Sequence, residues 1–338
     1  SYELNSKFFI PAVPQRKSYV WDQCDIVVSS MDTAKRSPHR EKVYEQDYDL
    51  VIIDEAHKLK NHKTKNYEFV QNLKKKFCLL LTATPIQNRV EEIFHLVSLL
   101  KPGHLGNESG FSERYKKGDR TLQEDEHLKS LINKVMIRNR RRDTGIEWTK
   151  RHVKTVLIDF NEAERDLYNS IDLLRGNYDD WANSSSFSLL TLQREACSSR
   201  EAVFYTLKNM LEKKEAPTAG FENTIGTLMK KVENVTMNSK AQKALEIVQS
   251  INDKVIIFTE YRATQLYLQW FLKQHGISSV PFRGGFKRGK KDWMRELFQK
   301  HAQVLIATEA GGEGINLQFC HHVINFDLPW NPMRLEQR

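Results

Sequence analysis

Residues 50–61, LVIIDEAHKLKN, decide the fold, because four aliphatic residues are followed at once by two carboxylates and a histidine. Short aliphatic runs are typical of strands buried in parallel sheets, and ligands gather at the carboxyl ends of such strands. A carboxylate there suits Mg²⁺, and its neighbour can orient or deprotonate an attacking water. We therefore expect Asp54 to bind the metal, Glu55 to activate water and His57 to sense a nucleotide. An acidic strand end that merely faces solvent is the alternative, which the Ala-His that follows disfavours.

Similar aliphatic runs recur in both halves of the chain, each followed by polar or glycine residues and then by a helical pattern. They occupy residues 25–28, 50–53 and 78–81 in the first part, and 255–258, 304–307 and 323–326 in the last. Between about Pro102 and Asn238 the sequence is charged and helical in pattern, with Asn161 as a candidate helix cap. The sequence predicts an α/β protein in which a helical insertion separates two parallel-sheet lobes.

The composition favours an intracellular protein with a polyanionic partner. The 338 residues carry a net charge of +9, with a pI near 9.2, although a basic surface that only keeps the protein soluble explains this charge equally well. No apolar stretch approaches the roughly 18 residues that would cross a membrane, so no membrane partner is expected. The location would be cytoplasmic in a bacterium and nuclear in a eukaryote. The cysteines, Cys24, Cys78, Cys197 and Cys320, are scattered and are expected to be reduced.

A second polar segment, LTATPIQN at residues 81–88, also follows an aliphatic run. Pro85 ends the strand and sets a rigid turn, so the hydroxyls of Thr82 and Thr84 can bond to a neighbouring acidic strand end. Such hydroxyls can transmit a change at a nucleotide. A plain turn with satisfied threonines is the alternative.

A third segment, ATEAGGEGINLQ at residues 307–318, places three glycines after a strand. Uncovered backbone N–H groups in such a loop suit phosphate oxygens, and Thr308 and Asn316 add side-chain contacts. A glycine-rich loop is weak evidence when it stands alone.

In this order, the segments resemble the Swi/Snf family of ATP-driven double-stranded DNA translocases, in helicase superfamily two. DEAHKLKN resembles the family's motif II, LTATPIQN its motif III, and SSMDTAKR at residues 29–36 its motif Ib. VIIFTEY at residues 255–261 is similar to motif IV, the glycine-rich loop to motif V, and FDLPWNP at residues 326–332 with Glu336 and Gln337 to the approach to motif VI.

The resemblance implies a fold, a set of ligands and residue roles. Residues 1–101 would form an incomplete RecA-like lobe with motifs Ib, II and III, residues 102–237 a helical insertion and linker, and residues 238–338 a second RecA-like lobe. The ligands would be ATP, Mg²⁺ and double-stranded DNA, with a DNA-bound protein complex as a further partner. Coupling roles are implied for Thr82, Thr84 and Gln337, and nucleic-acid contacts for Thr33, Lys35, Thr308, Gly312, Gly314 and Asn316.

Two departures from the family pattern affect the expected activity. No G-x-x-x-x-G-K-S/T loop is present, and no arginine pair follows Gln337, so the isolated chain is expected to be inactive while the intact protein would be an ATP-dependent DNA translocase. An RNA helicase is an alternative, disfavoured by the long helical insertion and the Trp-Asn-Pro triplet at residues 330–332. A non-catalytic nucleic-acid-binding or scaffold module is another, supported by the missing phosphate loop.

Overall fold

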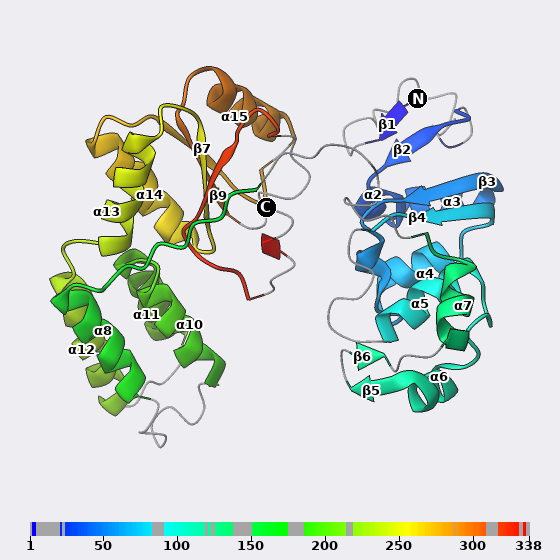
Figure 1. Cartoon of the computed structure of the whole chain (residues 1–338), viewed down its shortest axis with the longest axis horizontal. Helices are drawn as coiled ribbons and strands as arrows, with labels where there is room; N and C mark the ends of the chain where they lie inside the picture. The colour runs from blue at the N-terminus through cyan, green and yellow to red at the C-terminus, as the bar shows by residue number, and fades with distance from the viewer. Residues whose placement is uncertain are drawn as a thin grey trace. The chain divides into compact units, whose positions relative to one another are not determined.

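The chain forms two compact units, Ser1–Lys150 and Arg151–Arg338 (Figure 1). The structure is a computed structural model that describes residues 2–4, 21, 24–82, 91–118, 121–122, 126–137, 151–174, 186–213, 219–286, 288–308, 317–330 and 334–335. Both units combine helices with parallel strands, so the predicted α/β class is confirmed. The boundary between the units falls inside the segment 102–237, and the three-part division into lobe, insertion and lobe stays a prediction.

The first unit contains two parallel strand pairs, β1 with β2 and β3 with β4, in which Ile53 lies opposite Leu80. The strands are β1 (Tyr2–Leu4), β2 (Val27–Ser29), β3 (Tyr48–Ile53) and β4 (Lys75–Leu80), with a short antiparallel pair, β5 (Lys116–Gly118) and β6 (Thr121–Leu122). The helices are α2 (Met31–Ala34), α3 (His39–Glu45), the 3₁₀ turn η1 (Ala56–Leu59), α4 (Lys65–Gln71), α5 (Glu91–Leu100), α6 (Glu108–Tyr115) and α7 (Glu126–Asn133).

Helix α5 joins the two cores of the first unit. On one side it packs with η1, α4 and Ile53 of β3, and on the other with α6 and α7 through residues such as Phe94 and Phe111. The opposite face of the β3–β4 pair is apolar, and no described helix packs on it, since Leu50, Ile52, Phe77 and Leu79 are all exposed.

The second unit is built on a four-stranded parallel sheet of order β10-β7-β9-β8. Its strands are β7 (Val255–Thr259), β8 (Ser279–Phe282), β9 (Val304–Thr308) and β10 (His322–Asn325). Helices α13 (Ser239–Ser250) and α14 (Arg262–Gln274) cover one face, and α15 (Arg288–Lys300) covers the other. Because β7 and β9 are buried on both faces, their sequences are continuous apolar runs rather than alternating ones.

A helical bundle adjoins this sheet within the second unit. It comprises α8 (Glu162–Leu173), α10 (Ser186–Ala196), α11 (Arg200–Lys213) and α12 (Ala219–Asn234), which lie side by side (Figure 1) around a shared apolar core. Asn161 caps α8 as predicted, since its side chain accepts from Glu164 N and the Glu164 side chain accepts from Asn161 N. Among the described residues, no helix has the length and apolar character needed to span a bilayer.

Candidate nucleotide and nucleic-acid sites

Asp54 and Glu55 lie at the carboxyl end of β3, next to the segment that follows β4. Leu81 N donates to Ile53 O and Ala56 N donates to Leu81 O, both at 2.9 Å. The backbone hydrogen bonds between the two segments therefore continue beyond the last residues of β3 and β4. Both carboxylates are exposed. Since Mg²⁺ takes oxygen ligands and keeps several waters, an exposed carboxylate at this edge fits the ion.

Glu55 has a left-handed backbone, with φ 53° and ψ 45°. This conformation costs a non-glycine residue roughly 1–2 kcal/mol. The turn is held by a hydrogen bond from Glu55 N to Asp54 Oδ1 at 2.9 Å. Backbone strain of this kind is found preferentially at functional sites, where the surrounding structure maintains it.

His57 lies on η1, two residues beyond Glu55. Its Nδ1 is 3.1 Å from Glu55 Oε2, close enough for an ion pair when the imidazole is protonated, but it makes no hydrogen bond with any described residue. The Glu55 carboxylate is half exposed while His57 is largely buried, so the imidazole lies behind the acid. This geometry allows His57 to respond to a change in the position of Glu55.

The coupling residues are only partly described by the structure. Thr82 is the second residue after β4 and is half-buried, which places it at the same strand-end edge as Asp54 and Glu55. Thr84 and Gln337 lie outside the described residues. The coupling and catalytic roles of this group stay predictions.

The predicted nucleic-acid contacts divide between the two units. Thr33 and Lys35 lie at and just beyond the end of α2 in the first unit, while Thr308 ends β9 in the second. Lys35 Nζ already donates to Asn66 Oδ1 at 2.7 Å and pairs with Asp32 at 2.6 Å, so a phosphate would have to replace these partners.

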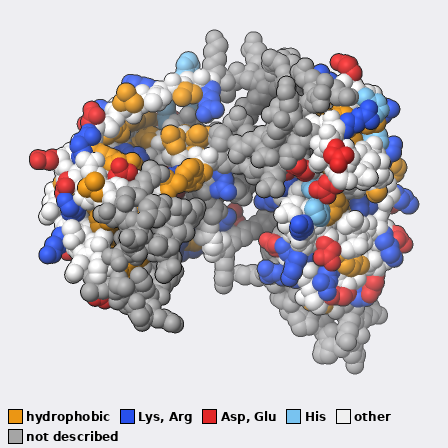
Figure 2. Space-filling model, turned by 90° about the horizontal axis from the view of Figure 1, so that it is seen from below, with side chains coloured by type: hydrophobic (Ala, Val, Ile, Leu, Met, Phe, Trp, Pro, Cys, Tyr) orange, Lys and Arg blue, Asp and Glu red, His pale blue; other side chains and the backbone are white. Residues whose placement is uncertain are grey.

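The remaining predicted contacts, Gly312, Gly314 and Asn316, lie outside the described residues. Figure 2 shows acidic and basic side chains interspersed on the face in view, rather than a single basic patch. Nucleic-acid contacts by Thr33, Lys35 and Thr308 therefore stay predictions.

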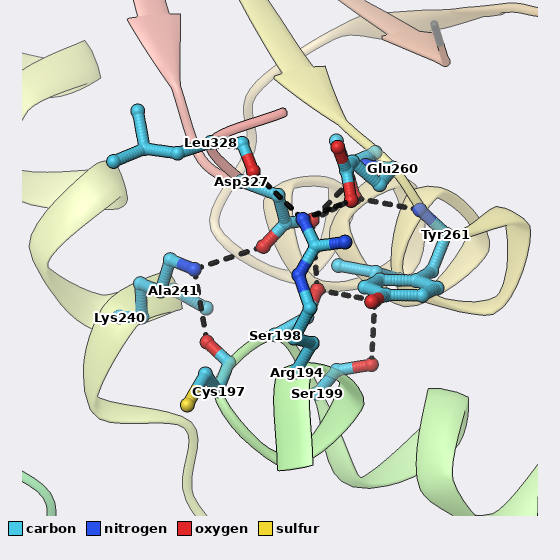
Figure 3. A network of polar contacts seen from close by, with 12 residues as sticks. Arg194, Cys197, Ser198, Ser199, Lys240, Ala241, Glu260, Tyr261, Asp327 and Leu328 are labelled. Carbon is cyan, nitrogen blue, oxygen red and sulfur yellow. Dashed lines mark hydrogen bonds and ion pairs between the residues drawn. The ribbon is translucent and has the colours of Figure 1, made fainter. Parts of the chain in front are cut away.

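Asp327 is the centre of a polar network at the carboxyl edge of the second sheet (Figure 3). Its Oδ2 accepts from Thr259 Oγ1 at 2.6 Å, Ser198 Oγ at 2.9 Å and Glu260 N at 3.1 Å. Its Oδ1 accepts from Lys240 Nζ at 2.9 Å. These donors come from β7, from the turn between α10 and α11, and from α13, so one carboxylate ties the bundle to the sheet.

Arg194 of α10 forms a second tie between the bundle and the sheet. Its guanidinium donates to Glu260 Oε2 at 2.5 Å and to Leu328 O at 2.9 Å, and lies 4.5 Å from the centre of the Trp330 ring. Sequence reasoning missed both Arg194 and Asp327. The only available signal for Asp327 was its place directly after the aliphatic run that ends at Phe326.

The family assignment follows from the domain matches. Residues 12–208 match the model of the SNF2-related domain, and residues 239–338 match that of the helicase conserved C-terminal domain. The chain belongs to the SNF2 family. The resemblance to the Swi/Snf family is thereby confirmed.

Several relatives of this SNF2-family chain are known. The uncharacterized ATP-dependent helicase YqhH of Bacillus subtilis (strain 168) is 68% identical over 337 residues, covering 99% of this chain and 60% of YqhH. The DNA repair and recombination protein RAD54-like of Drosophila virilis is 24% identical, covering 85% of this chain and 40% of that protein. The chain therefore spans 60% or less of the length of these relatives.

Among solved structures, the Sulfolobus solfataricus SWI2/SNF2 ATPase core in complex with dsDNA covers 93% of this SNF2-family chain and 64% of that chain, at 23% identity and a TM-score of 0.39. The Pyrococcus furiosus Hef helicase domain covers 92% of this chain and 72% of that chain, at 17% identity and a TM-score of 0.48.

Proposed function

We propose that this chain is the helicase-like core of an ATP-dependent double-stranded DNA translocase. The observation that carries the proposal is the strand-end geometry of the first unit, where the Asp54-Glu55 pair lies beside the segment that leads into LTATPIQN. The 68% identity to YqhH, whose name describes an ATP-dependent helicase, supports ATP as the substrate. The more distant similarity to a RAD54-like DNA repair and recombination protein favours DNA over RNA.

Four residues of the first unit would have separate roles in ATP hydrolysis. The exposed carboxylate of Asp54 would bind Mg²⁺ through its oxygen atoms. The ion, when bound, neutralises charge on the nucleotide phosphates. Glu55 would orient the attacking water and accept its proton. His57, 3.1 Å behind Glu55, would respond to the position of that carboxylate, and Thr82 would pass the change to the segment after β4.

Contacts to DNA would be made to the backbone. The predicted groups are hydroxyls, amides and one cation, which bond to phosphate oxygens and do not distinguish base edges. Binding would therefore be indifferent to base sequence and would weaken steeply with salt. Thr33 and Lys35 would supply contacts from the first unit and Thr308 from the second.

The deciding experiment measures ATP hydrolysis by the full-length protein with no nucleic acid, with duplex DNA and with duplex RNA. Duplex DNA should stimulate turnover, and Glu55→Gln should abolish it while nucleotide binding is retained. Glu68→Gln, which removes an exposed carboxylate from α4, is the matched control and should be active. Stimulation by RNA alone would favour an RNA helicase, and no hydrolysis under any condition would favour a non-catalytic binding module.

A further inference from the structure

Three metal-binding side chains converge in the first unit, outside the candidate nucleotide site. His62 lies in the turn between η1 and α4, His95 on α5, and Glu108 at the start of α6. His62 Nδ1 is 3.1 Å from His95 Nε2, and His95 Nε2 is 3.4 Å from Glu108 Oε1. One donor atom from each residue lies within 4.8 Å of the other two. The proposed hydrolytic chemistry uses none of these groups.

These separations match the edges of a tetrahedral metal site. Zinc lies about 2.0–2.2 Å from nitrogen and oxygen ligands, so two ligand atoms of a tetrahedral site are about 3.4 Å apart. The distances of 3.1 and 3.4 Å that join His95 to its two neighbours are close to this edge length. The third edge joins His62 to Glu108, whose side chains are both exposed, so rotation about their side-chain bonds can shorten it.

The middle ligand, His95, is held in place by its surroundings. The residue is 7% exposed, and Tyr67 Oη donates to its backbone carbonyl at 3.3 Å. The rings of Tyr67 and Phe94 both meet its imidazole edge to face. A donor fixed by packing in this way is a preorganised ligand.

We propose that His62, His95 and Glu108 bind a divalent transition-metal ion of the zinc class. Imidazole nitrogen and carboxylate oxygen are the ligands that Zn²⁺ accepts, with water in the fourth position. The ion would join the turn after η1 to α5 and α6, three elements that are apart in sequence. The turn that contains His62 follows the DEAHKLKN segment directly. The ion would therefore also restrict the motion of the segment that carries Asp54 and Glu55.

The test uses the whole chain, stripped of metal with a chelator and then titrated with Zn²⁺ by calorimetry and with Co²⁺ by visible absorption. We expect one equivalent of Zn²⁺ to bind, and Co²⁺ to show the intense absorption of tetrahedral coordination. His62→Ala and Glu108→Gln should each weaken Zn²⁺ binding by at least about tenfold, since even residues that only support ligands change affinity by that much. His152→Ala, which removes an exposed histidine from the second unit, should bind as the unmodified chain does.

Thermal unfolding gives a second, independent measurement. Because Zn²⁺ would bind the folded state, it should raise the Tm of the unmodified chain and of His152→Ala, and leave that of His62→Ala nearly unchanged. His62 and Glu108 are exposed, so their substitutions should preserve the fold, which circular dichroism checks. Absence of saturable binding would overturn the proposal. Equal binding by the unmodified chain, His62→Ala and Glu108→Gln would identify an adventitious ion only and would also overturn it.

Discussion

Replacement of Asp327 should loosen the second unit, because this carboxylate is the shared acceptor for donors from three separate elements. Asp327→Ala leaves the hydroxyls of Ser198 and Thr259, which are 1% and 0% exposed, without this acceptor. Each of the donors Thr259, Ser198 and Glu260 N loses an acceptor, and a buried polar group left unsatisfied costs about 1–3 kcal/mol. Since these contacts share one group and are not additive, we expect a loss of about 3–5 kcal/mol in total.

Asp327→Asn provides the matched comparison. Its amide oxygen can take the place of Oδ2 and keep the three donors Thr259, Ser198 and Glu260. Its amide nitrogen then faces the ammonium of Lys240, but that side chain is 26% exposed and keeps its bond to Cys197 O. The expected loss is therefore smaller, about 1–2 kcal/mol.

Hydrogen exchange followed by mass spectrometry measures this loss in one unit at a time. Amides of β7 should exchange about 10²- to 10⁴-fold faster in Asp327→Ala and about 5- to 30-fold faster in Asp327→Asn, if they exchange by unfolding of the second unit. Amides of β3, in the other compact unit, are the internal control and should not change. A change below about fivefold in Asp327→Ala, or equal changes in the two variants, would refute the stabilising role of the network.

Three further substitutions test individual features of the two units. Glu55→Gly should stabilise the first unit relative to Glu55→Ala by about 1 kcal/mol in urea denaturation, because glycine relieves the left-handed backbone, and equal stabilities would contradict the strain. Burial raises the pKa of Glu195 from its ordinary 4.5 to about 7, so the folded state should lose stability as the pH rises from about 4.5 through 7 and stay at the lower level above it. Glu195→Gln should remove this loss, and parallel Tm profiles for the two proteins between pH 5 and pH 8 would count against it. Arg194→Lys keeps the charge near Glu260 but loses the planar contact with Trp330 and the fixed guanidinium geometry in which Nη2 donates to both Glu260 and Leu328. The second unit should therefore lose about 1–2 kcal/mol, measured by hydrogen exchange of β7, where an unchanged rate would disprove the contribution.

Strands β2, β3, β4, β7, β9 and β10 could be predicted because each contains an aliphatic run, whereas the short strands β1, β5, β6 and β8 were missed. Residues 255–258 and 304–307 fall within β7 and β9, which are buried on both faces and therefore apolar at every position. Residues 78–81 locate β4 but miss its start, since β4 begins at Lys75 with two lysines. Polar residues on an exposed part of a strand give no aliphatic run, so the boundary was not visible in the pattern.

The polar clusters could not be predicted, because they join residues that are remote in sequence. Ser198 and Lys240 lie 129 and 87 positions from Asp327. His62 and His95 are 33 positions apart, far beyond the short spacings that identify metal sites from sequence. The pair Asp54-Glu55, by contrast, was visible because a strand end places adjacent residues at one edge of the sheet. Local periodicity predicts elements and their ends, whereas contacts between elements depend on how those elements pack.

The exposed face of β3 and β4 differs from the faces of the sheet in the second unit. In the second unit, helices cover both faces of the sheet, and the apolar runs of β7 and β9 are buried. In the first unit, the described helices cover only one face of β3 and β4, and Phe77 is 70% exposed and Ile52 57% exposed. Full burial of such a side chain is worth about 1.5–3 kcal/mol, and a contiguous apolar patch of this kind is uncommon on a monomeric surface. The apolar sequence of β3 and β4 is therefore typical of strands in a sheet that has helices on both faces.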